Sequence, residues 1–423
     1  MKSIVLTITF IALCASQCTA QGESAVPFLL ISPYAEANAM GEVSVANLTD
    51  DPVASMANPA HLGMQGLINV SWGGSNYSKW LPGFSVSDLR YKTFAVNGGI
   101  NIQKAFDSPL EIGIAAGYSR VYLNLGEFVR TLNDPTPIGT FHAYETSDQY
   151  SLGVGINYWF RASAGITSKY IVSKLAPAGA AGPDSGIASL NSYDYGLLLD
   201  VPVVEIFSRL QEAPVQVLPN VTPFLDVVFG FSKNNLGNAK VVYLDLAQSD
   251  PLPRYARIGI GFDFGLTYEK DGSKWKPFSF KWSREANDIL VRRFSDGSWE
   301  YRNGLGDINF FKEVILGNTN PETIRKTGWE FNFFELMYVR GGRFEEDPNR
   351  GNRRFSTSGF GLRLTGLARF LVGWSGADAT HEVLEFIEKH IDIRYNHSEL
   401  ETDARGHPLD NTRFDSLSLF LTN

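Results

Sequence analysis

The chain has 423 residues, enough for one large barrel or for two to three soluble domains. Charged residues make up only 19% of it, below the ~25% usual for soluble domains, whereas aromatic residues reach 13% and glycine 40 residues. This composition favours many β-strands that face an apolar environment. The net charge of −8 gives no reason to expect binding to a polyanion, and we predict no nucleic-acid partner.

Residues 1–20 predict a signal peptide. Lys2 supplies a positive charge, an apolar run from Ile4 to Ala15 follows, and Cys18-Thr19-Ala20 has the small-x-small pattern of a cleavage site. The apolar run is too short for a membrane-spanning helix, which needs ~20 residues. Because both cysteines, Cys14 and Cys18, lie in this segment, we expect the remaining chain to form no disulfide and to use no thiol chemistry.

Residues 21–65 precede the first expected strand, and we predict that they form a short helical plug inside a barrel. Proline is favoured in the first turn of a helix and glycine directly after its end, so Pro33 would start a short helix and Gly41 would end it. Met40 is flexible enough to pack inside a lumen, and Asn58 and Pro59 are further plug candidates. The alternative is a helix that caps the barrel from the periplasm.

From about residue 66 onward, apolar and small polar residues alternate with period two. In Tyr255 to Tyr268 the even positions are almost all apolar, and the odd positions are mostly glycine or polar. Such segments span ~9–13 residues, the length of a tilted strand that crosses a bilayer. No later stretch is long and apolar enough for a spanning helix, so a spanning chain must form a closed barrel. We therefore predict an all-β fold over 66–423: a transmembrane antiparallel β-barrel of 12 to 14 strands.

The expected connections alternate between long and short, which is typical of barrels with long loops outside and short turns in the periplasm. The stretch 202–221 departs from this pattern and contains a possible helix from Val204 to Glu212. We also predict a helix from Thr380 to His390 and a closing strand from Phe414 to Leu421. The long connections fall near 124–147, 175–192, 233–253 and 285–328, and the short ones near 104–109, 159–162, 268–275 and 342–353.

The connection at 285–328 is the longest and predicts an extracellular insertion. Asp296-Gly297 is typical of a hairpin turn and lies between two extended segments. This pattern predicts a β-ribbon above the barrel that is either a partner-binding edge or a lid on the lumen. The candidate binding residues are Arg292, Arg293, Phe294, Trp299 and Tyr301.

We find no arrangement of residues that predicts catalysis. The sequence has no Gly-x-Ser-x-Gly elbow, and Gly259-x-Gly261 and Gly153-x-Gly155 are strand glycines and not phosphate-binding loops. The six histidines are dispersed along the chain. We therefore expect no enzymatic activity, no cofactor and no metal site.

Several short motifs resemble the PorV/PorQ family of outer-membrane proteins. The block Phe28-Leu29-Leu30-Ile31-Ser32-Pro33-Tyr34-Ala35-Glu36-Ala37-Asn38-Ala39-Met40-Gly41 is similar to the family's opening, although Glu36 stands where that family usually has arginine. Asp50 to Leu62, with Asn58-Pro59-Ala60, is similar to the element that follows, and Trp80-Leu81-Pro82 and Asn411-Thr412-Arg413-Phe414 match weaker motifs. The resemblance implies a FadL-like barrel of 14 strands in the bacterial outer membrane.

The same resemblance implies a role in type IX protein secretion. The barrel would bind the C-terminal domain of secreted cargo at its extracellular mouth and hand it to surface attachment. Its partners would be the secretion translocon, cargo domains, and outer-membrane lipid or lipopolysaccharide. The alternatives are FadL-like passive transport of small hydrophobic compounds and a purely structural barrel. The expected inward face, mostly Gly, Ser, Thr and Asn with a few charges, disfavours a continuous apolar path for such compounds.

Overall fold

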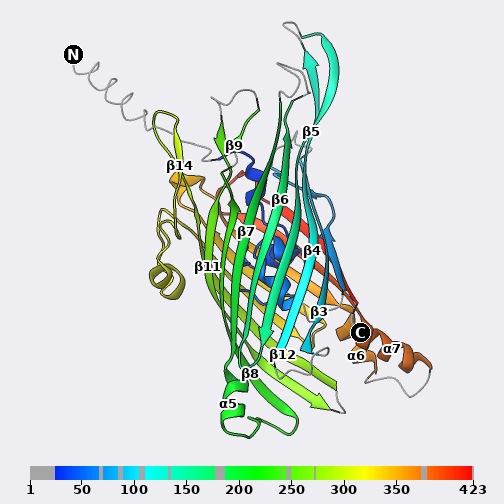
Figure 1. Cartoon of the computed structure of the whole chain (residues 1–423). Coiled ribbons are helices and arrows are strands. Elements are labelled where there is room, and N and C mark those ends of the chain that lie inside the picture. The colour runs from blue at the N-terminus through cyan, green and yellow to red at the C-terminus, as the bar shows by residue number, and fades with distance from the viewer. Residues whose placement is uncertain are drawn as a thin grey trace.

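The computed structural model describes residues 24–65, 70–83, 89–103, 110–131, 135–176, 186–238, 240–243, 249–270, 273–372 and 379–421. The predicted signal peptide lies outside these residues. Within them, the chain forms a β-barrel that surrounds a set of short N-terminal helices (Figure 1).

Antiparallel strands pair in chain order and close on themselves. Strand β1 pairs with both β19 and β3, which joins the two ends of the sheet. The sheet holds fifteen described strands, but β2 (Ser78–Lys79) only pairs with β3 beyond the end of β1, so fourteen strands form the wall. This confirms the predicted 14-stranded barrel. The wall strands are β1 (Val70–Ser75), β3 (Arg90–Asn101), β4 (Glu111–Thr131), β5 (Pro137–Asn157), β6 (Arg161–Lys174), β7 (Ile187–Pro202), β8 (Val221–Leu236), β11 (Tyr255–Lys270), β12 (Ser273–Ile289), β15 (Ile324–Phe333), β16 (Met337–Glu345), β17 (Arg354–Arg363), β18 (Ile391–Thr402) and β19 (Thr412–Leu421).

Apolar side chains point outward from the wall, and small or charged ones point inward. On β5, Leu152 and Val154 are exposed while Ser151 is buried; on β7, Leu197 is exposed while Asp194 is buried. The outward residues form a continuous apolar belt because alternate residues of a strand face opposite sides. Among the described residues, no helix is both long and apolar enough to span a bilayer.

The two ends of the barrel carry different structures (Figure 1). Helix α5 (Val203–Leu210) lies at one end, which we call the inner end, together with α6 (Leu364–Val372) and α7 (Ala379–His390). Helices α5 and α7 match the two helices expected from the sequence, whereas α6 was not predicted. The outer end carries the β4–β5 hairpin, the pair β9 (Lys240–Val241) and β10 (Asp250–Pro251), the ribbon β13 (Val291–Arg293) and β14 (Trp299–Tyr301), and the short helix η5 (Pro348–Arg350).

Two predictions about the connections were wrong. The stretch 124–147 is not a loop, because β4 and β5 continue through most of it as a hairpin that rises above the mouth. The stretch 342–353 holds the end of β16 and its connection to β17 at the outer end, and it is not an inner turn. The inner turn that precedes them, at 334–336, was missed because Phe334 and Glu335 adopt φ values of 57° and 52°, a conformation for which glycine or asparagine is the usual signal.

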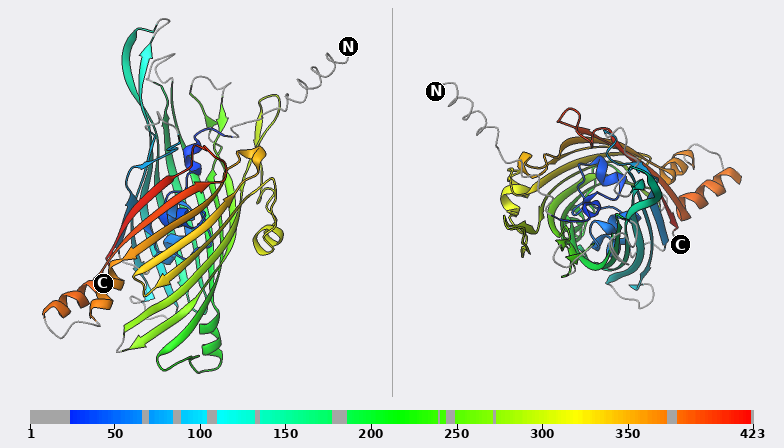
Figure 2. Two further views of the ribbon diagram at one scale, coloured as in Figure 1. Left: turned by 180° about the vertical axis from the view of Figure 1, so that it is seen from behind. Right: turned by 90° about the horizontal axis from the view of Figure 1, so that it is seen from above.

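The N-terminal segment lies inside the barrel, as the view along the barrel axis shows (Figure 2). We call residues 27–65 the hatch. Its Phe28 and Tyr34 are buried in the outer half of the lumen, in one apolar core with Phe344 and Phe355 of the wall. The last two rings stack with their centroids 4.6 Å apart. The hatch contains helices η1 (Pro27–Leu30), α2 (Ala35–Ala39), η2 (Pro52–Met56) and α3 (Ala60–Gln65).

The placement of the belt can be tested with two exposed apolar side chains, one inside the belt and one outside it. Leu152→Arg would place a charge against the membrane interior and lower the free energy of unfolding by about 2–4 kcal/mol. Ile138→Arg, on the hairpin above the mouth, would meet water and change it by less than about 0.5 kcal/mol. Urea titration of both variants in lipid vesicles measures the difference, and equal effects would contradict the placement of the belt.

Candidate functional site

The hatch touches the wall backbone to backbone at positions where the wall has glycine. A Cβ atom added at Gly165 would overlap the carbonyl oxygen of Pro59, and one added at Gly230 would overlap that of Val45. Only glycine permits such close approach. The inward glycines that meet the hatch backbone in this way are Gly153, Gly155, Gly165, Gly230, Gly261, Gly328 and Gly342, and Gly196 meets the Asn58 side chain.

Glu285 on β12 anchors the middle of the hatch. One of its carboxylate oxygens accepts hydrogen bonds from the backbone N–H groups of Ser44 at 2.8 Å and Val45 at 2.9 Å. Lys326 lies 3.5 Å from the other oxygen, and Arg257 donates to the Ser44 hydroxyl at 2.7 Å. Hydrogen bonds to a charged, buried acceptor are about twice as strong as neutral ones, so this carboxylate fixes the hatch chain against the wall.

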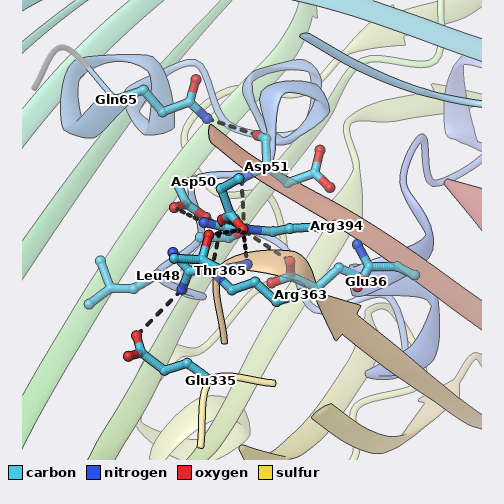
Figure 3. Close-up of polar contacts among 12 residues, drawn as sticks. Glu36, Leu48, Asp50, Asp51, Gln65, Glu335, Arg363, Thr365 and Arg394 are labelled. Carbon is cyan, nitrogen blue, oxygen red and sulfur yellow. Dashed lines mark hydrogen bonds and ion pairs between the residues drawn. The ribbon is translucent and has the colours of Figure 1, made fainter. Parts of the chain in front are cut away.

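Asp50 attaches the inner part of the hatch to the wall by an ion pair (Figure 3). Arg394 on β18 binds the Asp50 carboxylate with both terminal nitrogens, one of them at 2.8 Å. Asp392 in turn accepts from Arg394 at 2.6 Å and from Arg363 at 2.7 Å, and Arg363 also reaches Glu335 at 3.4 Å. The hatch is therefore part of a continuous charged network that runs to the inner end of the barrel.

A cavity of about 320 Å³ lies below the hatch at the inner end of the lumen. Its lining contains seven carboxyl groups and six basic groups, and few apolar side chains. The lumen thus holds far more charge than the few charges expected from the sequence. The ionisable lining residues are Glu36, Asp50, Asp51, Asp226, Asp263, Glu330, Glu335, Arg161, Lys276, Lys281, Arg340, Arg363 and Arg394.

Burial and neighbouring charges move the pKa values of hatch residues in opposite directions. Burial, together with the nearby Glu36 carboxylate, raises the pKa of Asp51 to about 7. The Arg394 guanidinium overcomes the effect of burial and holds the pKa of Asp50 well below its usual range. Burial lowers the pKa of His61 to about 4, and its Nε2 lies 2.8 Å from the carbonyl oxygen of Ser44.

The plug candidates from the sequence all lie in the hatch, but Pro33 does not start its helix. Helix α2 begins at Ala35 with Tyr34 as its N-cap, so Pro33 precedes it. Met40 is fully buried, and Gly41, at φ 68°, follows the helix and donates its N–H to Thr357 at 2.8 Å.

Asn58, followed directly by Pro59, connects two parts of the hatch. Its side chain accepts from the N–H of Ala60 at 3.1 Å, at the start of α3, and donates to the carbonyl oxygen of Val45 at 3.0 Å. The Asn-Pro-Ala element is thus a helix cap that also fixes the approach of a distant hatch segment.

The five candidate binding residues lie on or next to the predicted ribbon, but three are engaged with the neighbouring loop. Arg293 pairs with Asp250 at 2.5 Å, the Trp299 indole donates to the carbonyl oxygen of Ser249 at 3.0 Å, and the Tyr301 hydroxyl accepts from the N–H of Leu252 at 3.0 Å. Arg292 lies on β13 opposite Glu300, and Phe294 follows β13; both are exposed. Their role in binding stays a prediction.

Sequence reasoning missed the residues that carry most of the site. Glu285 and Arg394 are single charges with no local motif, Asp50 was noted only as the start of a family motif, and their partners lie hundreds of residues away along the chain. Phe128 and Ile138 of the β4–β5 hairpin were assigned to a loop, although they are exposed apolar residues in paired strands.

The closed wall, the outward apolar belt and the charged, filled lumen define an integral β-barrel of the bacterial outer membrane, because only closed barrels and helices pair every backbone group in lipid. Solved structures with a similar fold include a Pseudomonas aeruginosa FadL homologue, at 12% sequence identity and a TM-score of 0.37. The match covers 93% of this chain and 98% of that one. The Pseudomonas putida toluene transporter TodX is also similar, at 10% sequence identity and a TM-score of 0.36, over 92% of this chain and 97% of that one. No protein-family model and no curated protein sequence matches the chain, so the PorV/PorQ resemblance stays a prediction.

Removal of the Glu285 carboxylate tests the anchor. Glu285→Ala would leave two buried N–H groups without acceptors and weaken the hatch contact by about 2–4 kcal/mol. Glu285→Gln keeps an acceptor oxygen and should cause a clearly smaller loss. Hydrogen–deuterium exchange of the 44–46 amides in detergent micelles measures both, and exchange at the wild-type rate in Glu285→Ala would show that the carboxylate is not the anchor.

Asp51 should make stability depend on pH. Its pKa in the folded protein, about 7, exceeds the ~3.9 of an unfolded aspartate, so the folded state holds the proton more tightly. The resulting stabilisation is complete below about pH 4 and is lost as the pH rises through 7, by at most roughly 1.4 kcal/mol per pH unit. Urea titrations at pH 5 and pH 8 should show that the wild type loses stability relative to Asp51→Asn. A constant difference would mean that Asp51 keeps an ordinary pKa.

Proposed function

We propose that the protein is a non-enzymatic, closed outer-membrane barrel of a protein secretion system, PorV-like in role. It binds the C-terminal domain of secreted cargo at its outer mouth and hands that cargo to surface attachment. The translocon of a type IX system is the expected neighbour. The short motifs of the hatch segment support this assignment, and the outer end of the barrel supports a binding role.

The observation that carries the proposal is the β4–β5 hairpin, which stands above the mouth (Figure 1). Phe128, Val129 and Ile138 are exposed there, although they lie beyond the belt that faces the membrane. Apolar residues gathered on a protruding, water-facing element are typical of protein-binding surfaces.

The hairpin also has open edges. Beyond Asn124 on β4 and Tyr144 on β5, the described strand pairs join these two strands only to each other. The outer backbone groups of both strands are therefore available to an extended segment of a partner, which is the β-augmentation mode of peptide recognition.

The filled lumen favours binding at the mouth over transport through the barrel. The hatch occupies the lumen in backbone contact with the wall, and the cavity below it is lined by thirteen ionisable side chains. A small hydrophobic compound would leave an apolar environment for a charged one on this path, which costs free energy.

The hairpin provides the test. Full-length tagged protein is purified from its own outer membranes in mild detergent, and cargo C-terminal domains and the translocon are identified by mass spectrometry. Phe128→Ser combined with Ile138→Ser removes the apolar surface and should reduce recovery of cargo domains at least tenfold. Thr140→Ala, an exposed position on the same hairpin, should leave recovery unchanged.

Two results would count against the proposal. Unchanged cargo recovery with the double variant would show that the hairpin is not the docking element. Recovery of the wild-type barrel alone, with small hydrophobic molecules bound in its lumen, would support the transport alternative. Unaltered migration of the unheated barrel in SDS gels serves as the control for correct folding of each variant.

A further inference from the structure

The connection between β12 and β15 descends along the outside of the barrel. After the ribbon β13–β14, the chain turns down and forms a short π-helix, η4 (Phe310–Ile315), beside the wall (Figures 1 and 2). Val314 of this helix is buried against Ile260 and Ala286, which belong to β11 and β12. The loop therefore covers part of the belt that otherwise faces lipid.

The descending loop is held in a defined shape by buried polar contacts. The Glu313 carboxylate accepts from the N–H of Asn309 at 2.7 Å and from the Asn320 side chain at 3.1 Å. Asp288 on the wall accepts from the N–H of Asp307 at 2.7 Å and from Arg302 at 2.7 Å. Asp288 therefore fixes the start of the segment to the wall, and Glu313 holds the loop together around η4.

Apart from Lys312, the outward side of η4 is apolar. Phe311 is 61% exposed, and Ile315 and Leu316 are also exposed. Three large apolar side chains next to the transmembrane belt are more stable in hydrocarbon than in water. We infer that this part of the loop lies in the outer leaflet of the membrane.

A groove of about 460 Å³ separates η4 from the neighbouring strands β7 and β8. The side chains that line it are apolar: Leu197, Leu199, Phe229, Phe231, Ile258 and Phe310. The groove opens on the lipid-facing surface, where the surrounding molecules are acyl chains. Its size lies in the range of ordinary ligand pockets.

A basic side chain lies at the outer end of this groove. Lys233 follows Phe231 by two residues on the same face of β8, and its ammonium donates to the carbonyl oxygen of Gly304 at 3.1 Å. The Tyr195 ring lies 5.7 Å from that of Phe231, where aromatic residues of an outer interface are expected. The apolar groove therefore ends beside a cation at the level of lipid headgroups.

We propose that this groove binds one acyl chain of a phosphorylated outer-leaflet glycolipid, the lipid A part of lipopolysaccharide, with its phosphate beside Lys233. The apolar groove alone distinguishes little between lipids, because bilayer and groove are both hydrocarbon-like. The cation supplies the selectivity, since each basic residue near an anionic lipid surface contributes about 1 kcal/mol. The proposal is independent of the function proposed for the mouth.

The test is native mass spectrometry of the purified, delipidated full-length barrel titrated with lipid A or with phosphatidylethanolamine. The wild type should bind lipid A about threefold to tenfold more tightly than phosphatidylethanolamine. Leu197→Trp fills the groove and should weaken lipid A binding at least tenfold. Lys233→Gln, which keeps a donor to Gly304 but loses the charge, should weaken it about threefold to tenfold.

Matched controls come from the wall outside the groove. Leu152→Trp alters an outward leucine of the same exposure, 56% against 53% for Leu197, and should leave binding unchanged. Lys92→Gln, two residues from the outward Phe94 of β3, should also have no effect. If Leu197→Trp does not fold, Phe310→Ala removes one side of the groove from outside the barrel wall and should weaken binding instead.

Three results would overturn the proposal. Equal loss with Leu197→Trp and Leu152→Trp would show general lipid contact without a groove site. Equal affinities for lipid A and phosphatidylethanolamine would show that the groove is not selective for the phosphorylated glycolipid. Unaltered binding in Phe310→Ala would show that the loop does not contribute to lipid binding.

Discussion

The close contact between the hatch backbone and the inward glycines determines how this barrel is built. Glycine in the interior of a strand destabilises it by roughly 0.5–1 kcal/mol relative to alanine, so the seven glycines that meet the hatch backbone weaken an empty wall. The hatch fills the space that the missing side chains leave, and its Met40 and Pro59 carbonyl oxygens lie where Cβ atoms would otherwise be. The wall and the hatch therefore depend on each other for stability, and neither is a complete structure alone.

Buried charge complements this contact. Glu285 binds the hatch at mid-lumen and Asp50 at the inner end. From Asp50 the network continues through Arg394, Asp392, Arg363 and Glu335 to Arg369 on α6, whose guanidinium also donates to Glu388 on α7 at 2.8 Å. Helices outside the barrel are thus joined to the hatch by consecutive ion pairs. Loss of one partner would leave a buried charge without compensation, which makes the filled state of the lumen strongly favoured.

Local patterns were sufficient to predict the wall but not the contacts inside it. Alternation in Tyr255 to Tyr268 follows from the geometry of a single strand, and α7 follows from spacing within one helix, so both were predicted. The glycines were also noticed, but only as strand residues, because their role depends on hatch atoms 90 or more positions away along the chain. The same holds for Glu285 and Arg394. The β4–β5 hairpin was assigned to a loop because a strand that leaves the membrane loses the contrast between lipid and lumen that produces alternation.

The apolar surfaces of this protein differ in the solvent that they face, and not in the kind of residue that forms them. Leu152 and Phe128 are similarly exposed, yet one lies in the belt and the other on a hairpin above the mouth. In hydrocarbon, exposure costs nothing and leaves little drive for association; in water it favours burial by a partner. The loop between β12 and β15 spans both conditions: its ribbon packs on the mouth through Trp299 and Tyr301, and its η4 helix lies against the belt. One insertion thereby joins the water-facing mouth of the barrel to its lipid-facing belt.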